Sequence, residues 1–159
     1  MASKSWATRL ASYLKISAQN RGFATVRDDL KYGSSHEWVK VEGNCVTIGI
    51  SDHALHHLGN VIFVQLPDEG AQLKQGTSFA TVESMKSTSD VNSPISGRVV
   101  EVNTELTGSP GLMNASPYEK GWIVKVEIAN GEEVKTLMDP EHYSKFCEEE
   151  EEEEEDANH

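Results

Sequence analysis

The apolar runs of this chain are short, rich in β-branched residues and interrupted by turn residues. The densest run covers residues 61–66, and the turn signal at residues 67–70 ends it. Residues 38–41 and 44–50 flank Glu42-Gly43 as the strands of a hairpin would. A small all-β sandwich or barrel is therefore expected. No run approaches the length of a membrane span, so no membrane partner is expected.

Short helices are expected around this β-rich body. Residues 52–58 form one, because Ser51 or Asp52 can cap its start and Gly59 can end it. Further strands are expected at residues 95–102 and 122–128, and further helices at 132–138 and 139–146. In the last helix Asp139 would be the N-cap and Pro140 the first helical residue.

The first 23 residues differ from the rest in composition. They contain four basic residues and no Asp or Glu, and their larger side chains recur at helical spacing. This is the pattern of a mitochondrial transit peptide, with cleavage predicted after Phe23. We therefore predict a transit peptide over residues 1–23, a domain over 24–147 and location in the mitochondrial matrix. The alternatives for residues 1–23 are a disordered basic tail or a surface helix.

The chain is acidic, with a formal net charge of −12. Without the first 23 residues the net charge is about −16, a field that repels nucleic acid, and no nucleic-acid partner is expected. Eight glutamates and an aspartate follow one another in residues 148–156. Because like charges repel at this density, residues 148–159 are predicted to be a disordered acidic tail.

The candidate metal ligands are few and scattered. Cys45 and Cys147 fit no metal spacing and are expected to be reduced thiols, with Cys45 in the core. His53, His56 and His57 share one face of the predicted short helix, but no further ligand lies near them in the sequence. We therefore expect no metal site.

Lys86 is the main candidate functional residue. It lies in a polar segment with β-type runs on either side, and Gly76 and Gly97 bracket it almost symmetrically. An amine at the apex of such a bend projects from the protein and can carry a covalent group. A solvated surface charge is the alternative for any single lysine.

Four separated segments stand out along the chain: Ser35-His36-Glu37-Trp38-Val39, Gly49-Ile50-Ser51-Asp52-His53-Ala54, Glu83-Ser84-Met85-Lys86 and residues 110–122. They resemble the glycine cleavage system H protein family, in the family's order, and the resemblance covers residues 31–146. The family usually has Val and Ala beside the lysine, where this chain has Met85 and Ser87.

This resemblance implies a mainly β fold, the flattened β-barrel/sandwich hybrid of lipoyl and biotinyl carriers, with short peripheral helices. It also implies lipoate in amide linkage to Lys86, put there by lipoate-attaching enzymes. The chain would be a non-catalytic carrier. It would take an aminomethyl group of glycine from the P protein (glycine decarboxylase) to the T protein (aminomethyltransferase). The L protein (dihydrolipoamide dehydrogenase) would then reoxidise the arm.

The family pattern also implies roles for four polar residues. Ser35, Glu37 and Asp90 would shelter the loaded arm and hold its ammonium group, with ordinary turn and surface positions as the alternative. Glu83 would be recognised by the attaching ligase, with a solvated carboxylate as the alternative.

Three competing functions remain open at this point. The chain could be another swinging-arm carrier, either a biotin carrier or an acyltransferase lipoyl domain, although the latter would have a Pro/Ala-rich linker instead of an acidic tail. It could be an enzyme that uses Lys86 as a nucleophile, but Glu83 and Asp90 would keep that amine charged. It could also be a structural adaptor in which Lys86 is never modified.

Overall fold

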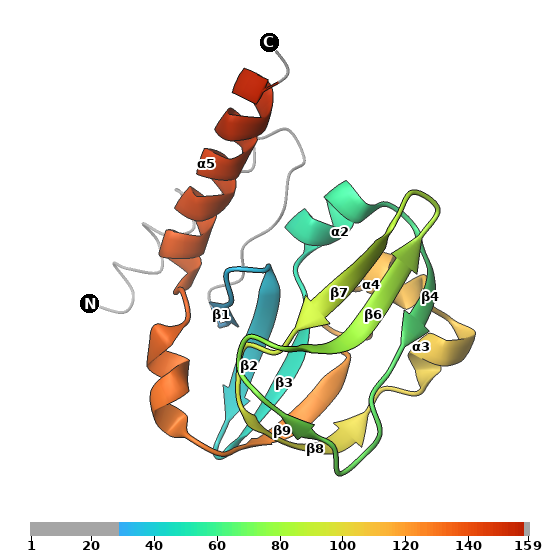
Figure 1. Cartoon of the computed structure of the whole chain (residues 1–159), viewed down its shortest axis with the longest axis vertical. Coiled ribbons are helices and arrows are strands. Elements are labelled where there is room, and N and C mark those ends of the chain that lie inside the picture. Colours follow the sequence, from blue (N-terminus) through green and yellow to red (C-terminus); the bar gives the residue numbers. More distant parts are fainter. Residues whose placement is uncertain (1–28, 158–159) are drawn as a thin grey trace.

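The computed structural model describes residues 29–157 and shows two antiparallel β-sheets with several short helices and one longer C-terminal helix around them (Figure 1). The larger sheet has the order β1 (Lys31–Tyr32), β2 (Glu37–Glu42), β3 (Cys45–Ile50), β9 (Val124–Ile128), β8 (Gly97–Val102) and β5 (Gln72–Leu73). The smaller sheet has the order β4 (Val61–Gln65), β6 (Ser78–Ser84) and β7 (Thr88–Asn92). The helices are α2 (Asp52–Leu58), α3 (Glu105–Gly108), α4 (Leu112–Ala115), the 3₁₀ helix η1 (Gly131–Thr136) and α5 (Pro140–Ala157).

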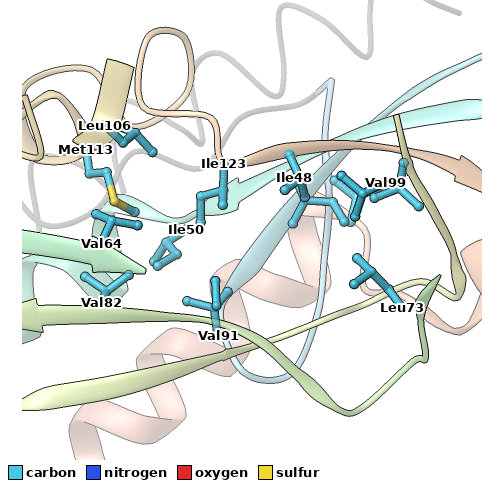
Figure 2. Close-up of a cluster of buried hydrophobic side chains, with 14 of the residues drawn as sticks. Ile48, Ile50, Val64, Leu73, Val82, Val91, Val99, Leu106, Met113 and Ile123 are labelled. Carbon is cyan, nitrogen blue, oxygen red and sulfur yellow. The ribbon is translucent and has the colours of Figure 1, made fainter. Parts of the chain in front are cut away.

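The hydrophobic core lies between the two sheets (Figure 2). Ile48 and Val99 come from the larger sheet, Val82 and Val91 come from the smaller one, and all four are essentially inaccessible to solvent. Met113 of α4 closes one end of the core. The prediction of a mainly β fold with short peripheral helices is confirmed. In the described part of the chain the sheets share no strand, so the fold is a sandwich and not a closed barrel.

Several local signals act as the sequence predicted. The Ser51 hydroxyl accepts a hydrogen bond from the Ala54 N–H and caps α2, and Gly59 ends this helix with a φ of 88°. The Asp139 carboxylate accepts from the His142 N–H at 2.8 Å and so caps α5. The predicted hairpin of β2 and β3 forms, with Glu42 paired to Cys45 and Gly43 in the turn at a φ of 66°.

A second apolar cluster attaches α5 to the larger sheet. The rings of Tyr32 in β1 and Tyr143 in α5 stack with centroids 4.0 Å apart, and both side chains are fully buried. Leu30, Trp38 and Cys147 are the other buried residues of this cluster. None of the described helices is both long and apolar enough to cross a membrane.

Three sequence predictions need correction or fall outside the description. The acidic run is not a disordered tail, because α5 continues through it to Ala157. Cys45 is half-buried and not a core residue, whereas Cys147 is buried, and both are free thiols. The predicted transit peptide, residues 1–23, lies outside the described residues.

Candidate functional site

The β6–β7 hairpin places Lys86 at its apex. Ser84 ends β6, and Thr88 begins β7, so three residues make the turn. The Ser84 hydroxyl is buried and accepts hydrogen bonds from the N–H groups of Lys86 at 3.1 Å and Ser87 at 3.2 Å. The Ser84 N–H donates to the Ser87 carbonyl at 2.8 Å. These bonds hold the backbone of the turn while the Lys86 side chain stays exposed.

The Lys86 side chain lies over the C-terminal end of α2, beside which Figure 1 shows the hairpin tip. Its Cε is 3.5 Å from the position that a Cβ on Gly59 would occupy. Its Nζ is 3.5 Å from the His57 carbonyl oxygen, a long contact. Within residues 29–157 no carboxylate lies at ion-pair distance from this amine. The amine is therefore accessible and can form an amide without breaking a strong interaction.

Glu37 is a buried carboxyl at the start of β2, with 3% of its surface exposed. It accepts hydrogen bonds from the backbone N–H groups of Glu37 and Asn92, which lower its pKa, but burial has the larger effect and raises the pKa to about 7. Gly33 leaves room for it, because a Cβ there would be 2.9 Å from Glu37 Oε1. A nearby cation would favour the ionised form of this carboxyl.

Ser35 and Glu37 meet at Asn92. The Asn92 side-chain amide donates to the Ser35 hydroxyl at 3.3 Å, while the Asn92 N–H reaches the Glu37 carboxyl. Asp90 lies two residues earlier on β7 and, by the alternation of a strand, on the same face as Asn92, about 7 Å away. Asp90 thus lies between the Lys86 tip and the Ser35–Glu37 pair along β7, and no hydrogen bond joins it to Ser35 or Glu37 in the described structure.

The turn that carries Ser35 has an unusual backbone. His36 has a φ of +73°, the left-handed region that non-glycine residues seldom adopt. The His36 N–H closes this turn by donating to the Gly33 carbonyl at 3.1 Å. The turn reverses the chain between β1 and β2 and so directs Ser35 toward β7.

The surface beside the tip is partly apolar. Glu83 is exposed and lies opposite Phe63 of β4, whose side chain is 49% exposed. Ile62 and Met85 are also exposed large apolar residues near this end of the smaller sheet. A carboxylate beside exposed apolar side chains is a surface that another protein can contact.

Sequence reasoning did not identify Ser84 or Asn92. Ser84 has a local signal, since a serine hydroxyl can bond to N–H groups two and three residues ahead in a turn. Asn92 has none, because its partners Ser35 and Glu37 are more than fifty residues away in the sequence.

A family model described as "Glycine cleavage H-protein" matches residues 30–150. The chain belongs to the glycine cleavage H-protein family.

Individual relatives agree with this assignment. The mitochondrial glycine cleavage system H protein 2 of Arabidopsis thaliana is 61% identical over 155 residues, covering 97% of this chain and 96% of the relative. The mitochondrial H protein of Pisum sativum is 52% identical, with coverage of 94% and 98%. The crystal structure of an H protein from Mycobacterium marinum has a TM-score of 0.69 and 35% identity, covering 75% of this chain and 96% of that one.

Membership of this family favours one of the functions that the sequence left open. The chain is a carrier protein of the glycine cleavage system, and it is mitochondrial like its relatives. The biotin-carrier and acyltransferase alternatives are not favoured.

Proposed function

We propose that Lys86 is the lipoyl-bearing residue and that the chain is a non-catalytic shuttle for the aminomethyl group of glycine. The main support for this proposal is that the Lys86 amine is exposed on a turn, and that hydrogen bonds to the Ser84 hydroxyl hold the backbone of this turn. The chain also belongs to this family of carriers. Lipoate in amide linkage would supply a dithiolane that takes up and releases the one-carbon amine by sulfur exchange. Amide formation also removes the lysine charge, which favours entry of the arm into dry active sites.

The polar residues along β7 would hold the cargo between partners. A loaded arm carries an ammonium group, and a buried carboxyl is its natural counter-ion. Glu37 is such a carboxyl, Ser35 lies beside it through Asn92, and Asp90 lies on the path from the tip. Folding the arm back along β7 would place the ammonium group near these oxygen atoms and shield it from water.

The partners follow from this role. The carrier would receive its cargo from the P protein, deliver it to the T protein and be reoxidised by the L protein. Lipoate-attaching enzymes would recognise the tip through Glu83, which is exposed three residues before the lysine. Residues 1–23 would direct the chain into the matrix and be removed there.

Peptide mass spectrometry on protein purified from mitochondria tests the attachment site. We expect the lipoyl mass on the peptide containing Lys86 and on no other lysine. Lys86→Arg should abolish both the modification and glycine oxidation in a reconstituted system, whereas Lys74→Arg, at another exposed lysine, should change neither. An unmodified Lys86 in protein that supports glycine oxidation would overturn the proposal.

The sheltering role has its own test. Glu37→Gln keeps the shape of the side chain but removes the counter-ion, so loss of the aminomethyl cargo from the loaded chain should be faster by about tenfold or more. A hydrogen bond to a charged group contributes about 1.5–3 kcal/mol. The control is Glu105→Gln at the start of α3, which should behave as the parent. Equal rates of cargo loss for Glu37→Gln and the parent would exclude this role.

A further inference from the structure

A group of metal-binding side chains lies where α5 packs beside α2. His53 of α2 and Cys147 of α5 are buried, and His36 precedes β2. One ligand atom of each of these three residues lies within 4.8 Å of the others. Glu150 of α5 adds a fourth: its Oε1 is 2.7 Å from His36 Nε2 and 3.7 Å from His53 Nε2.

The spacing of these atoms is close to that of a tetrahedral zinc site. Zn–N bonds of about 2.0–2.1 Å and Zn–S bonds of about 2.3 Å place neighbouring ligand atoms about 3.3–3.8 Å apart. The three atoms of His36, His53 and Cys147, which lie within 4.8 Å of one another, would have to approach one another by at most about 1.5 Å. The hydrogen bond between His36 and Glu150 would open by a similar amount. Both movements are within the reach of side-chain rotation.

In both His36 and His53, the ring nitrogen that would not bind the metal, Nδ1, lies near a polar partner, as is usual for metal-binding histidines. His36 Nδ1 is 2.8 Å from the Tyr143 hydroxyl, which in turn is 2.6 Å from the Ser51 hydroxyl. His53 Nδ1 is 3.8 Å from the Glu151 carboxylate. The hydrogen bond to Tyr143 can fix the His36 tautomer with N–H on Nδ1 and the lone pair on Nε2. The Glu151 carboxylate lies beyond hydrogen-bond distance and favours the same tautomer of His53 electrostatically.

We propose that this chain binds one zinc ion through His36 Nε2, His53 Nε2, Cys147 Sγ and Glu150 Oε1, and that the ion fastens α5 to α2 and the start of β2. The thiolate and the carboxylate balance the charge of Zn²⁺. On binding, the Cys147 thiol releases its proton to water. The His36 imidazole stays neutral: its N–H moves to Nδ1 and donates to the Tyr143 hydroxyl, which then donates to Ser51.

This site revises the expectation of no metal and does not depend on the lipoyl role of Lys86. The sequence showed only the histidines of one helix, whereas the fold adds His36 from a preceding turn and two residues of α5. A neighbouring set, His53 with His57 and Glu151, is the alternative cluster. This set is less suitable because His57 is exposed and because the set contains no thiolate. It also offers three ligands, whereas a closed structural zinc site has four.

Binding can be tested with cobalt(II) as a spectroscopic substitute for zinc on the untagged full chain. A tetrahedral site with a thiolate gives a sulfur-to-cobalt charge-transfer band in the near ultraviolet and intense visible bands. We expect these bands to reach a plateau at one cobalt per chain and to disappear when zinc is added. Zinc should also raise the melting temperature of the parent chain, by preferential binding to the folded state.

Variants then identify the ligands. Cys147→Ser should remove the charge-transfer band, and Glu150→Gln should weaken zinc binding at least about tenfold. The half-exposed Glu150 makes the second variant a mild change to the fold, and circular dichroism of both metal-free variants checks that they fold. Cys45→Ser and His57→Gln are the matched controls and should bind as the parent does.

Three results would overturn the proposal. The first is the absence of a thiolate band in the parent chain. The second is loss of binding in His57→Gln with retention in Cys147→Ser, which would place the ion in the neighbouring cluster. The third is weak binding of several ions that no single substitution alters, which would indicate the acidic surface of α5.

Discussion

At the scale of single residues, the proposed carrier site uses opposite environments for its two main charged groups. Lys86 is exposed at a tip, where a ligase can reach its amine, while Glu37 is buried, where water cannot compete for a bound cation. Burial raises the pKa of Glu37 to about 7, so a cationic cargo and this carboxyl would stabilise one another's charged forms.

Ser84 is the residue that shapes the tip. Ser84→Ala removes the acceptor for the N–H groups of Lys86 and Ser87, and we expect the free energy of unfolding to fall by about 1–2 kcal/mol. Urea denaturation of the parent and the variant measures this change. Ser89→Ala, at an exposed serine on β7, should have almost no effect. An equal loss in both variants would mean that the Ser84 hydroxyl does not hold the turn.

At the scale of elements, the acidic run is helical because several local and long-range contacts act together. Asp139 caps α5, glutamate is a good helix former, and Tyr143 and Cys147 bury one face of the first turns. Near Ala157 the repulsion between neighbouring glutamates still opposes the helix. The prediction of a disordered acidic tail was based on charge repulsion alone and did not include the cap or the buried face.

The pairing of β8 with β9 depends on the lack of a side chain at Gly97. A Cβ at this position would be 2.1 Å from the Glu127 carbonyl oxygen, so Gly97→Ala forces the strands apart. We expect a loss of about 1–3 kcal/mol in the free energy of unfolding, measured by urea denaturation. Gly108→Ala is the control, because a Cβ there has no neighbour within 4 Å. A Gly97→Ala chain as stable as this control would contradict the strand geometry.

At the scale of the whole molecule, the sandwich supports the exposed hairpin tip that would carry the proposed arm. The core between the sheets holds β6 and β7, and the tip extends beyond it (Figures 1 and 2). We therefore expect the stability of the folded chain and the exposure of Lys86 to depend on different residues.

Ile48→Ala tests this separation. Ile48 is fully buried in the core, and its truncation should lower the free energy of unfolding by about 2–5 kcal/mol. Below the melting temperature of the variant, attachment of lipoate to Lys86 by a purified ligase should proceed at the parent rate, measured by intact mass. A slower rate in the folded variant would show that the tip depends on core packing.

The sequence alone determined the features that depend on neighbours along the chain. These are the β-rich runs, the caps at Ser51 and Asp139, the bend at Lys86 and the segments shared with the family. The meeting of distant groups depends on the folded arrangement: Glu37 and Ser35 meet at Asn92, and His36 and His53 lie beside Cys147. The reason is physical, since spacing and propensity act within a few residues, whereas burial and side-chain contacts depend on how the sheets and α5 pack.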